Sequence, residues 1–174
     1  ENKKGVVTNA VYGYLTMFLR LLEDESPTHI GAVFDVHAPT FRHGMYDGYK
    51  AQRKPMPEEL VLQMPLIHEL LEEMGVKIIE KAGYEADDII GTLAKRFDVP
   101  TVIVSGDKDV LQLVDENTEV YHTRRGVTDV KIYTLETLSE EGLTPALVVE
   151  MKARRGDASA KHPGCRIYPV DSLA

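Results

Sequence analysis

Apolar side chains recur at helical spacing near the start of the chain. Within residues 8–22 they fall at i, i+3, i+4, i+7, i+8 and i+11, which places them along one side of a helix. These residues are Val11, Tyr14, Leu15, Phe18, Leu19 and Leu22. Thr8 stands just before this stripe and is suited to cap the first turn. The pattern predicts an amphipathic helix over residues 8–22.

Short apolar runs alternate with further helical segments along the rest of the chain. We expect strands at 29–34, 76–79, 101–104 and 120–122. We expect helices at 57–74, 84–97 and 144–154, and a short helix that ends at Leu113. Such alternation is typical of a central, mostly parallel sheet flanked by helices. The sequence therefore predicts an α/β fold, in which ligands gather beyond the carboxyl ends of the strands.

The length and composition fit one folded domain without a membrane segment. The chain has 174 residues, enough for a sizeable core. No apolar run approaches the roughly 20 residues that a membrane span needs, and the polar residues 1–5 do not resemble a signal peptide. The one cysteine, Cys165, cannot form an internal disulfide, which suits a reducing compartment. We therefore expect a cytoplasmic protein with no membrane partner.

The distribution of charge is more informative than its sum. A formal net charge of −8 argues against a nucleic-acid binder, because phosphate contacts need Lys and Arg. However, residues 42–54 hold four basic side chains and one acid, whereas residues 85–88 hold three acids and no base. A basic segment separate from an acidic cluster is what a metal-dependent nuclease requires, because cations hold phosphates and carboxylates hold metal ions.

Carboxylates stand just past predicted strand ends and at predicted helix starts. They are Asp35, Glu85, Asp87, Asp88, Asp107, Asp109 and Asp157. Hard divalent cations prefer oxygen ligands, and two such ions a few ångströms apart can hydrolyse a phosphodiester. Taken singly, each acid is as well explained by a helix dipole, a helix cap or a turn. Their joint placement at one edge of an α/β sheet favours a metal site.

Linked motifs in a fixed order give the chain a family resemblance. They are Phe34-Asp35, Pro39-Thr40-Phe41-Arg42-His43, Tyr49-Lys50-Ala51, Arg53-Lys54-Pro55-Met56-Pro57, Gly83-Tyr84-Glu85-Ala86-Asp87-Asp88 and Ser105-Gly106-Asp107-Lys108-Asp109. This series resembles the 5′-nuclease (5′-3′ exonuclease) domain of bacterial DNA polymerase I, which belongs to the flap endonuclease group with a PIN-like fold. The resemblance runs from about residue 5 to residue 157, and we take 1–157 as this domain.

The resemblance implies roles for the acids. Asp35, Glu85, Asp87 and Asp88 match acids of a first metal site and its surroundings, and Asp107 and Asp109 match a pair that serves the same cluster. Asp157 matches the first acid of a later Gly-Asp motif at a second metal. The resemblance implies two ions, Mg²⁺ or Mn²⁺, and phosphodiester hydrolysis at DNA 5′ ends and flaps.

The basic segment, residues 37–57, matches the helical arch of the family, through which a 5′ end or flap passes, and we call it the arch segment. If it is helical, Arg42, Tyr46, Tyr49, Lys50 and Arg53 share one face. The resemblance places Arg42 and Lys50 near the scissile phosphate, as catalytic residues. The expected DNA-binding residues are Arg42, His43, Tyr46, Tyr49, Lys50, Arg53 and Lys54. Gly44 and Gly48 weaken a helix, so we expect a mobile segment that orders on DNA.

The chain departs from the family pattern at both ends. It starts after the family's opening strand, which supplies a metal ligand, and Ala160 stands where the family has a second Asp. Residues 158–174 take the place of the helix-hairpin that grips duplex DNA, as an aberrant or truncated tail; a shift of reading frame is one hypothesis for it. We therefore expect a truncated α/β core with weak or no nuclease activity.

Two other functions remain open from the sequence. The chain could bind branched or 5′-ended DNA without cutting it, or it could be a PIN-type ribonuclease. The arch segment and the Gly-Tyr-Glu-Ala-Asp-Asp run argue against the ribonuclease. The six histidines show no zinc-like spacing, and no P-loop motif is present. A polymerase domain in the parent protein is a possible partner.

Overall fold

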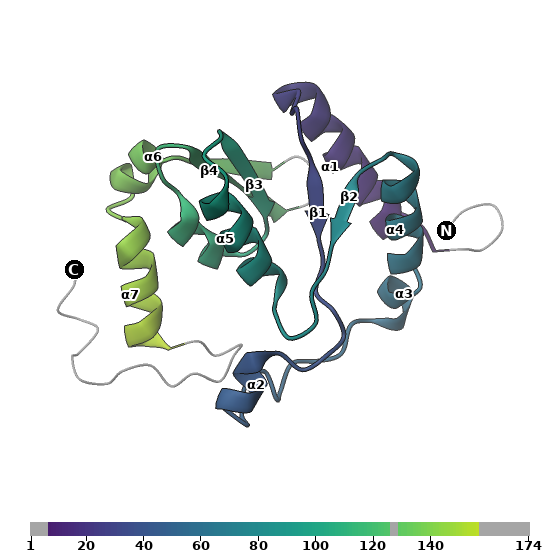
Figure 1. Cartoon of the computed structure of the whole chain (residues 1–174), viewed down its shortest axis with the longest axis horizontal. Helices are drawn as coiled ribbons and strands as arrows, with labels where there is room; N and C mark the ends of the chain where they lie inside the picture. Colours follow the sequence, from purple (N-terminus) through teal and green to yellow (C-terminus); the bar gives the residue numbers. More distant parts are fainter. Residues whose placement is uncertain (1–6, 126–128, 157–174) are drawn as a thin grey trace.

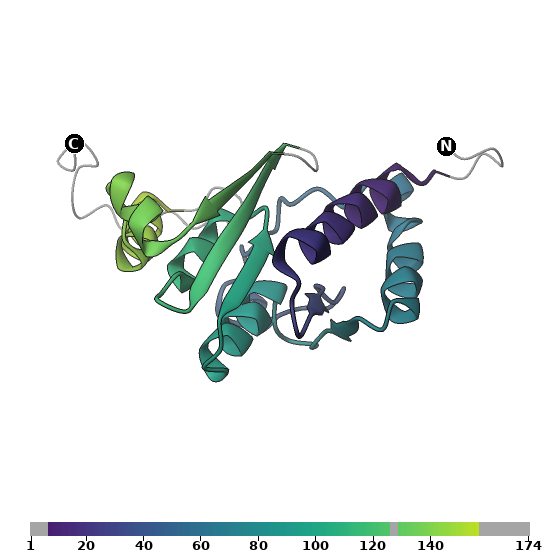
Figure 2. The ribbon, with the colours of Figure 1, turned by 90° about the horizontal axis from the view of Figure 1, so that it is seen from above.

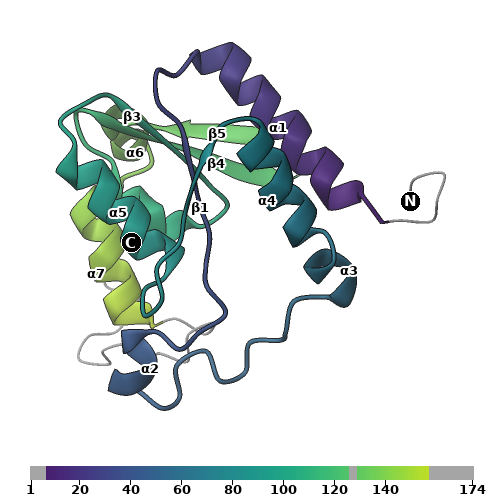
Figure 3. The same ribbon diagram turned by 45° about the vertical axis from the view of Figure 1, so that its right-hand side comes forward.

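The computed structural model describes residues 7–125 and 129–156. Its first part holds a long helix, α1 (Asn9–Glu25), and a two-stranded parallel sheet of β1 (Gly31–Val33) and β2 (Lys77–Ile79). Ala32 lies opposite Ile78 in this sheet. Between the strands the chain forms α2 (Phe41–Met45), α3 (Glu58–Val61) and α4 (Met64–Glu73). Helices α1 and α4 pack together beside β2, as Figures 1 and 3 show.

The second part is a three-stranded sheet with helices around it. α5 (Ala86–Arg96) leads to β3 (Thr101–Ser105), the 3₁₀ helix η1 (Lys108–Leu113), β4 (Thr118–Arg125) and β5 (Asp129–Tyr133). The chain ends its described part with α6 (Leu135–Glu140) and α7 (Pro145–Arg155). β3 pairs with β4 in parallel and β4 with β5 antiparallel. Figures 1 and 2 show α6 and α7 at one end of the molecule and α1 and α4 at the other.

Each sheet has its own hydrophobic cluster. The first consists of Phe18, Ala32, Ile67, Leu71 and Val76. The second consists of Ala94, Ile103, Val110, Leu111, Val114, Val120, Tyr133 and Leu138. No described helix is long and apolar enough to cross a membrane.

The expected α/β class and the parallel strand pairing are confirmed, with three differences. The sheet is divided: β1 and β3 belong to separate sheets. The helix expected over 57–74 breaks into α3 and α4, because Pro65 stands in the first turn of α4 and has no N–H with which to continue a helix from α3. Strand β5 and helix α6 were not expected. The alternation of polar and apolar residues in β5 is too short to predict a strand by itself. The strand forms because Tyr133 lies opposite Val120 in the core.

Candidate metal and nucleic-acid site

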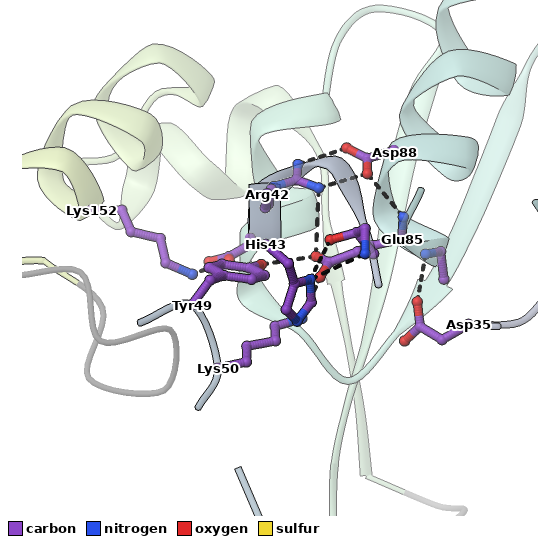
Figure 4. Close-up of polar contacts among 11 residues, drawn as sticks. Asp35, Arg42, His43, Tyr49, Lys50, Glu85, Asp88 and Lys152 are labelled. Carbon is purple, nitrogen blue, oxygen red and sulfur yellow. Dashed lines mark hydrogen bonds and ion pairs between the residues drawn. The ribbon is translucent and has the colours of Figure 1, made fainter. Parts of the chain in front are cut away.

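The carboxyl ends of the strands lead to the predicted acids. Asp35 lies two residues beyond β1, and its Oδ1 accepts a 2.7 Å hydrogen bond from the backbone N–H of Ala86, the first residue of α5. A carboxylate at this place is favoured by the helix dipole. Asp35 therefore joins the end of one strand to the start of the helix that carries the other acids, as Figure 4 shows.

The turn before α5 fixes Glu85 and Asp88. Gly83 has a φ of +86°, a conformation open to glycine at no steric cost, and its carbonyl accepts a 3.0 Å bond from the N–H of Phe41 at the start of α2. The Asp88 carboxylate accepts a 3.0 Å bond from the backbone N–H of Glu85. This hydrogen bonding holds the two carboxylates at the first turn of the helix, next to the arch segment.

Asp87 lies where the separate groups of acids influence one another. Burial raises the pKa of its carboxyl, and the negative charges of Asp107, Asp35, Asp109 and Glu85 raise it further. Like charges have this effect only when they are close. Acids from the end of β1, the start of α5 and the loop after β3 therefore share one electrostatic field.

The described acids influence one another electrostatically, but they do not form a complete set of metal ligands in this structure. Among residues 7–125 and 129–156, no group of three or more His, Cys, Asp or Glu side chains is positioned to hold a metal ion. The carboxylate donors themselves are of the type that Mg²⁺ and Mn²⁺ prefer. Asp157 lies outside the described residues.

Basic and phenolic side chains of the arch segment contact the acids of α5. Both terminal nitrogens of Arg42 donate to Asp88, each at 2.7 Å. Lys50 Nζ donates to Glu85 Oε1 at 2.9 Å, and the Tyr49 hydroxyl donates to Oε2 at 3.0 Å. Figure 4 shows the three side chains converging on the start of α5. Sequence spacing alone does not reveal these contacts, because the partners lie 35 to 46 positions apart.

These ion pairs change the pKa values of Asp88 and Lys50. The hydrogen bonds from Arg42 lower the pKa of Asp88, although burial opposes the change. Burial disfavours the charge of Lys50, but the hydrogen bond and charge of Glu85 outweigh it, so the pKa of Lys50 is raised. Asp88 and Lys50 therefore remain charged around neutral pH.

The arch segment is not a single helix, so its basic and aromatic residues do not share one helical face. Helix α2 ends at Met45, and Tyr46 is extended, with φ −150° and ψ 108°. Tyr46 is 48% exposed, and Arg53 and Lys54 are exposed beyond the turn. Two causes account for the difference. Residues 44, 47 and 48 are poor helix formers, and Arg42 and Lys50 form ion pairs with the acids at the start of α5.

His43 has a local contact within the arch segment. Its Nδ1 accepts a 3.1 Å bond from the backbone N–H of Thr40 and so helps to cap α2. Its ring also meets Tyr49 edge-on, with 5.2 Å between ring centroids. His43 therefore positions the start of α2 and the ring of Tyr49.

The loop after β3 carries the remaining predicted metal ligands among the described residues, Asp107 and Asp109. Helix α7 adds a residue that the sequence analysis did not identify. Asp107 caps η1 by accepting a 2.9 Å bond from the N–H of Asp109. Lys152 of α7 forms an ion pair with Asp109. No motif marks Lys152 in the sequence, because its role depends on how α7 packs against η1.

Relatives in sequence point to one family. The model of the family described as the 5′-3′ exonuclease, N-terminal resolvase-like domain, matches residues 1–142. DNA polymerase I of Bacillus subtilis (strain 168) is 48% identical over 170 residues, which cover 94% of this chain and 19% of that protein. The chain thus spans about a fifth of the length of the curated relatives it matches.

Solved structures share the fold. The structure of bacteriophage T5 5′-exonuclease with bound divalent metal ions (zinc) matches with a TM-score of 0.72 at 18% identity, over 96% of this chain and 65% of that one. The T5 flap endonuclease in a pseudo-enzyme-product complex with DNA and metal ions matches with a TM-score of 0.69, also at 18% identity, over 97% and 65%. At this identity the likeness confirms the PIN-like α/β fold. The family model matches most of the chain, and the acids are arranged as described above. The chain therefore belongs to the family of 5′-3′ exonuclease N-terminal, resolvase-like domains.

Proposed function

We propose that this chain carries the metal-dependent centre of a DNA 5′-nuclease that hydrolyses phosphodiesters at 5′ ends and flaps. The observation that carries the proposal is the hydrogen bond from the start of α5 to Asp35, which joins this acid to the helix that follows Glu85 and carries Asp87 and Asp88, with the basic arch segment bonded to Glu85 and Asp88. Excess negative charge in one place is unfavourable unless cations neutralise it. Divalent ions supply that neutralisation and bind phosphate oxygens as well.

The metal ligands in this proposal are the acids named from the sequence. Asp35, Glu85, Asp87, Asp88, Asp107 and Asp109 would hold Mg²⁺ or Mn²⁺, and Asp157, outside the described residues, would serve a second ion. Such ions generate a nucleophile from water and stabilise the leaving oxygen. The chain contributes an oxygen-only donor set that suits these ions.

The arch segment would bind the DNA strand. Arg42 presents a planar fork of donors that matches a phosphate, and Lys50 presents a compact positive charge. Both side chains lie beside the carboxylates and so could hold the scissile phosphate next to the metal ions. Tyr46, which is exposed, could stack on an unpaired base. His43, Tyr49, Arg53 and Lys54 complete the proposed DNA-binding set.

A cleavage assay on a labelled 5′-flap DNA tests the proposal. We expect weak cleavage with Mn²⁺ or Mg²⁺ and none in chelator. Changes to the outer partners of metal ligands already cost about 10- to 100-fold in activity, so Asp107→Asn should lower the rate by more than about 100-fold. Asp115→Asn is the matched control, because it removes an acid that pairs with Lys95 away from the cluster.

Other results would assign a different function. Cleavage that persists in chelator, or that Asp107→Asn leaves unchanged, would contradict the metal mechanism. Binding of the flap DNA in chelator, with no product under any condition, would indicate a non-catalytic binder. Preference for an RNA flap over the same DNA flap would indicate a PIN-type ribonuclease.

A further inference from the structure

The arch segment and the proposed metal ions need the same carboxylate oxygens. Arg42 bonds both oxygens of Asp88, each at 2.7 Å. Lys50 and Tyr49 take one oxygen each of Glu85, at 2.9 and 3.0 Å, and Arg42 lies 3.6 Å from Glu85 Oε2. A divalent cation that approaches these oxygens is repelled by the positive charges of Arg42 and Lys50. The cation and these two side chains therefore compete for the same carboxylates.

Partial burial makes the arch segment a serious competitor. The side chains of Glu85 and Asp88 are 13% and 21% exposed, and those of Lys50 and Arg42 are 24% and 32% exposed. Salt and water screen such pairs less than they screen surface pairs. The Arg42–Asp88 contact is also bidentate, which is the stronger geometry for a guanidinium and a carboxylate.

The backbone of Lys50 indicates a held conformation. Its φ is +51°, in the left-handed region that non-glycine residues rarely adopt. Such a conformation persists only where surrounding contacts maintain it. The Lys50 side chain is held by the bond to Glu85 and lies over the ring of Tyr49, and its carbonyl accepts a 2.9 Å bond from the N–H of Arg53.

We propose that the arch segment is a lock that divalent cations open. Without metal, Arg42, Tyr49 and Lys50 close over Glu85 and Asp88. Cation binding at these carboxylates displaces the three side chains and frees Arg42 and Lys50 to hold phosphate. Coupling of this kind is reciprocal, so a closed arch segment weakens metal binding by the factor with which metal opens it. The lock rests on the proposed role of Glu85 and Asp88 as metal ligands.

Mn²⁺ binding to the whole 174-residue chain, followed by electron paramagnetic resonance in the absence of DNA, tests the lock. We expect Arg42→Gln and Lys50→Gln each to bind Mn²⁺ about tenfold more tightly than the unmodified chain, within the usual range of coupling between sites. Tyr49→Phe keeps the net charge and removes one hydrogen bond to Glu85, so it should tighten binding by about two- to fivefold.

Arg20→Gln is the control, because it removes one positive charge and one exposed pair, with Asp24, on α1. Its affinity should equal that of the unmodified chain. If Arg42→Gln and Lys50→Gln bind no more tightly than this control, the lock is wrong, whether or not the chain cleaves DNA. Equal affinity of Tyr49→Phe and the unmodified chain would overturn it too, in a variant that keeps its aromatic ring.

Failure of the lock and failure of the proposed function give different results. Mn²⁺ binding that is tighter in the three variants, with no cleavage of flap DNA, would support the lock and contradict the nuclease. Cleavage of flap DNA with unchanged Mn²⁺ affinities in the three variants would support the nuclease and contradict the lock. Absence of Mn²⁺ binding in every protein would overturn both.

Discussion

Individual charged side chains in this protein are held by partners from distant segments. Asp87 shows the unfavourable case, since burial and four neighbouring acids raise its pKa. Asp115 shows the favourable case. It pairs with Lys95 of α5, accepts a 2.9 Å bond from the N–H of Asn117, and its pKa is lowered to about 2, chiefly by the hydrogen bond from Lys95.

The pair between Asp115 and Lys95 predicts a pH dependence of stability. A carboxyl whose pKa falls on folding stabilises the native state above its ordinary pKa of 3.8, and this contribution is lost as the pH falls toward 2. At pH 6, Asp115→Asn should lower the free energy of unfolding by about 0.2–1 kcal/mol, as for an exposed pair. Urea unfolding of both proteins between pH 6 and pH 2 should show this difference shrinking below pH 4. A difference independent of pH would contradict the assignment.

Helices and strands are joined by buried polar contacts as well as by apolar packing. Gln63, 2% exposed between α3 and α4, accepts hydrogen bonds from the N–H groups of Ala10 and Val11 at 2.8 and 3.3 Å. It also donates to Asn9 and to the carbonyl of Glu59. The first N–H groups of a helix have no partner within the helix, so Gln63 supplies the cap that Thr8 does not.

Substitution of Gln63 by Leu should therefore destabilise the protein, although the two side chains are similar in volume. The variant keeps a side chain of similar volume but leaves the two N–H groups of α1 without an acceptor, which costs about 1–3 kcal/mol. Gln52→Leu, at an exposed position of the arch segment, should change stability by less than about 0.5 kcal/mol. Thermal or urea unfolding measures both. Equal stabilities of the two variants would argue against a capping role.

The arch segment shows how far the pattern of one element can be trusted. The sequence identified Arg42, Tyr49 and Lys50 as functional candidates by residue type and family motif. Helical spacing would place them on one face with Tyr46 and Arg53 only if the segment were one helix, and helix α2 ends at Met45. Helical spacing describes a segment only while the helix continues, and ion pairs with α5 decide where these side chains point.

The molecule as a whole is built from two hydrophobic clusters, one for each sheet. Ile67 belongs to the first cluster and Ile103 to the second, and both are at most 5% exposed. Between the clusters run the hydrogen bond of Asp35 to α5 and the ion pairs of the arch segment. Each part therefore has its own apolar cluster, whereas the candidate site is among the contacts that link the parts.

This arrangement predicts additive effects on stability. Ile67→Val and Ile103→Val should each lower the free energy of unfolding by about 0.5–1.5 kcal/mol. Since the two residues share no cluster, the double variant should equal the sum of the single variants within about 0.5 kcal/mol. Urea unfolding of the four proteins measures the cycle. A larger deviation would show that the two clusters are energetically coupled.

The sequence by itself determined the local structure and the chemical types of the candidate residues. Apolar periodicity predicted α1, α4, α5, α7 and the parallel strands, because burial of one face is encoded over a few turns or a few residues. It also placed Asp35 and Asp107 just past strand ends, where the structure has them. The separation into two sheets and the antiparallel pairing of β5 depended on contacts between elements.

Only the tertiary structure decided which charges meet. Arg42 and Asp88 lie 46 positions apart, and Lys152 and Asp109 lie 43 apart. No periodicity links such partners, because an ion pair depends on the angle and distance at which two packed elements present their side chains. The position of the acids just past strand ends and at helix starts could be foreseen from residue order. The pairing of Asp88 and Asp109 with basic side chains of the same chain followed from how the arch segment and α7 pack against α5 and η1.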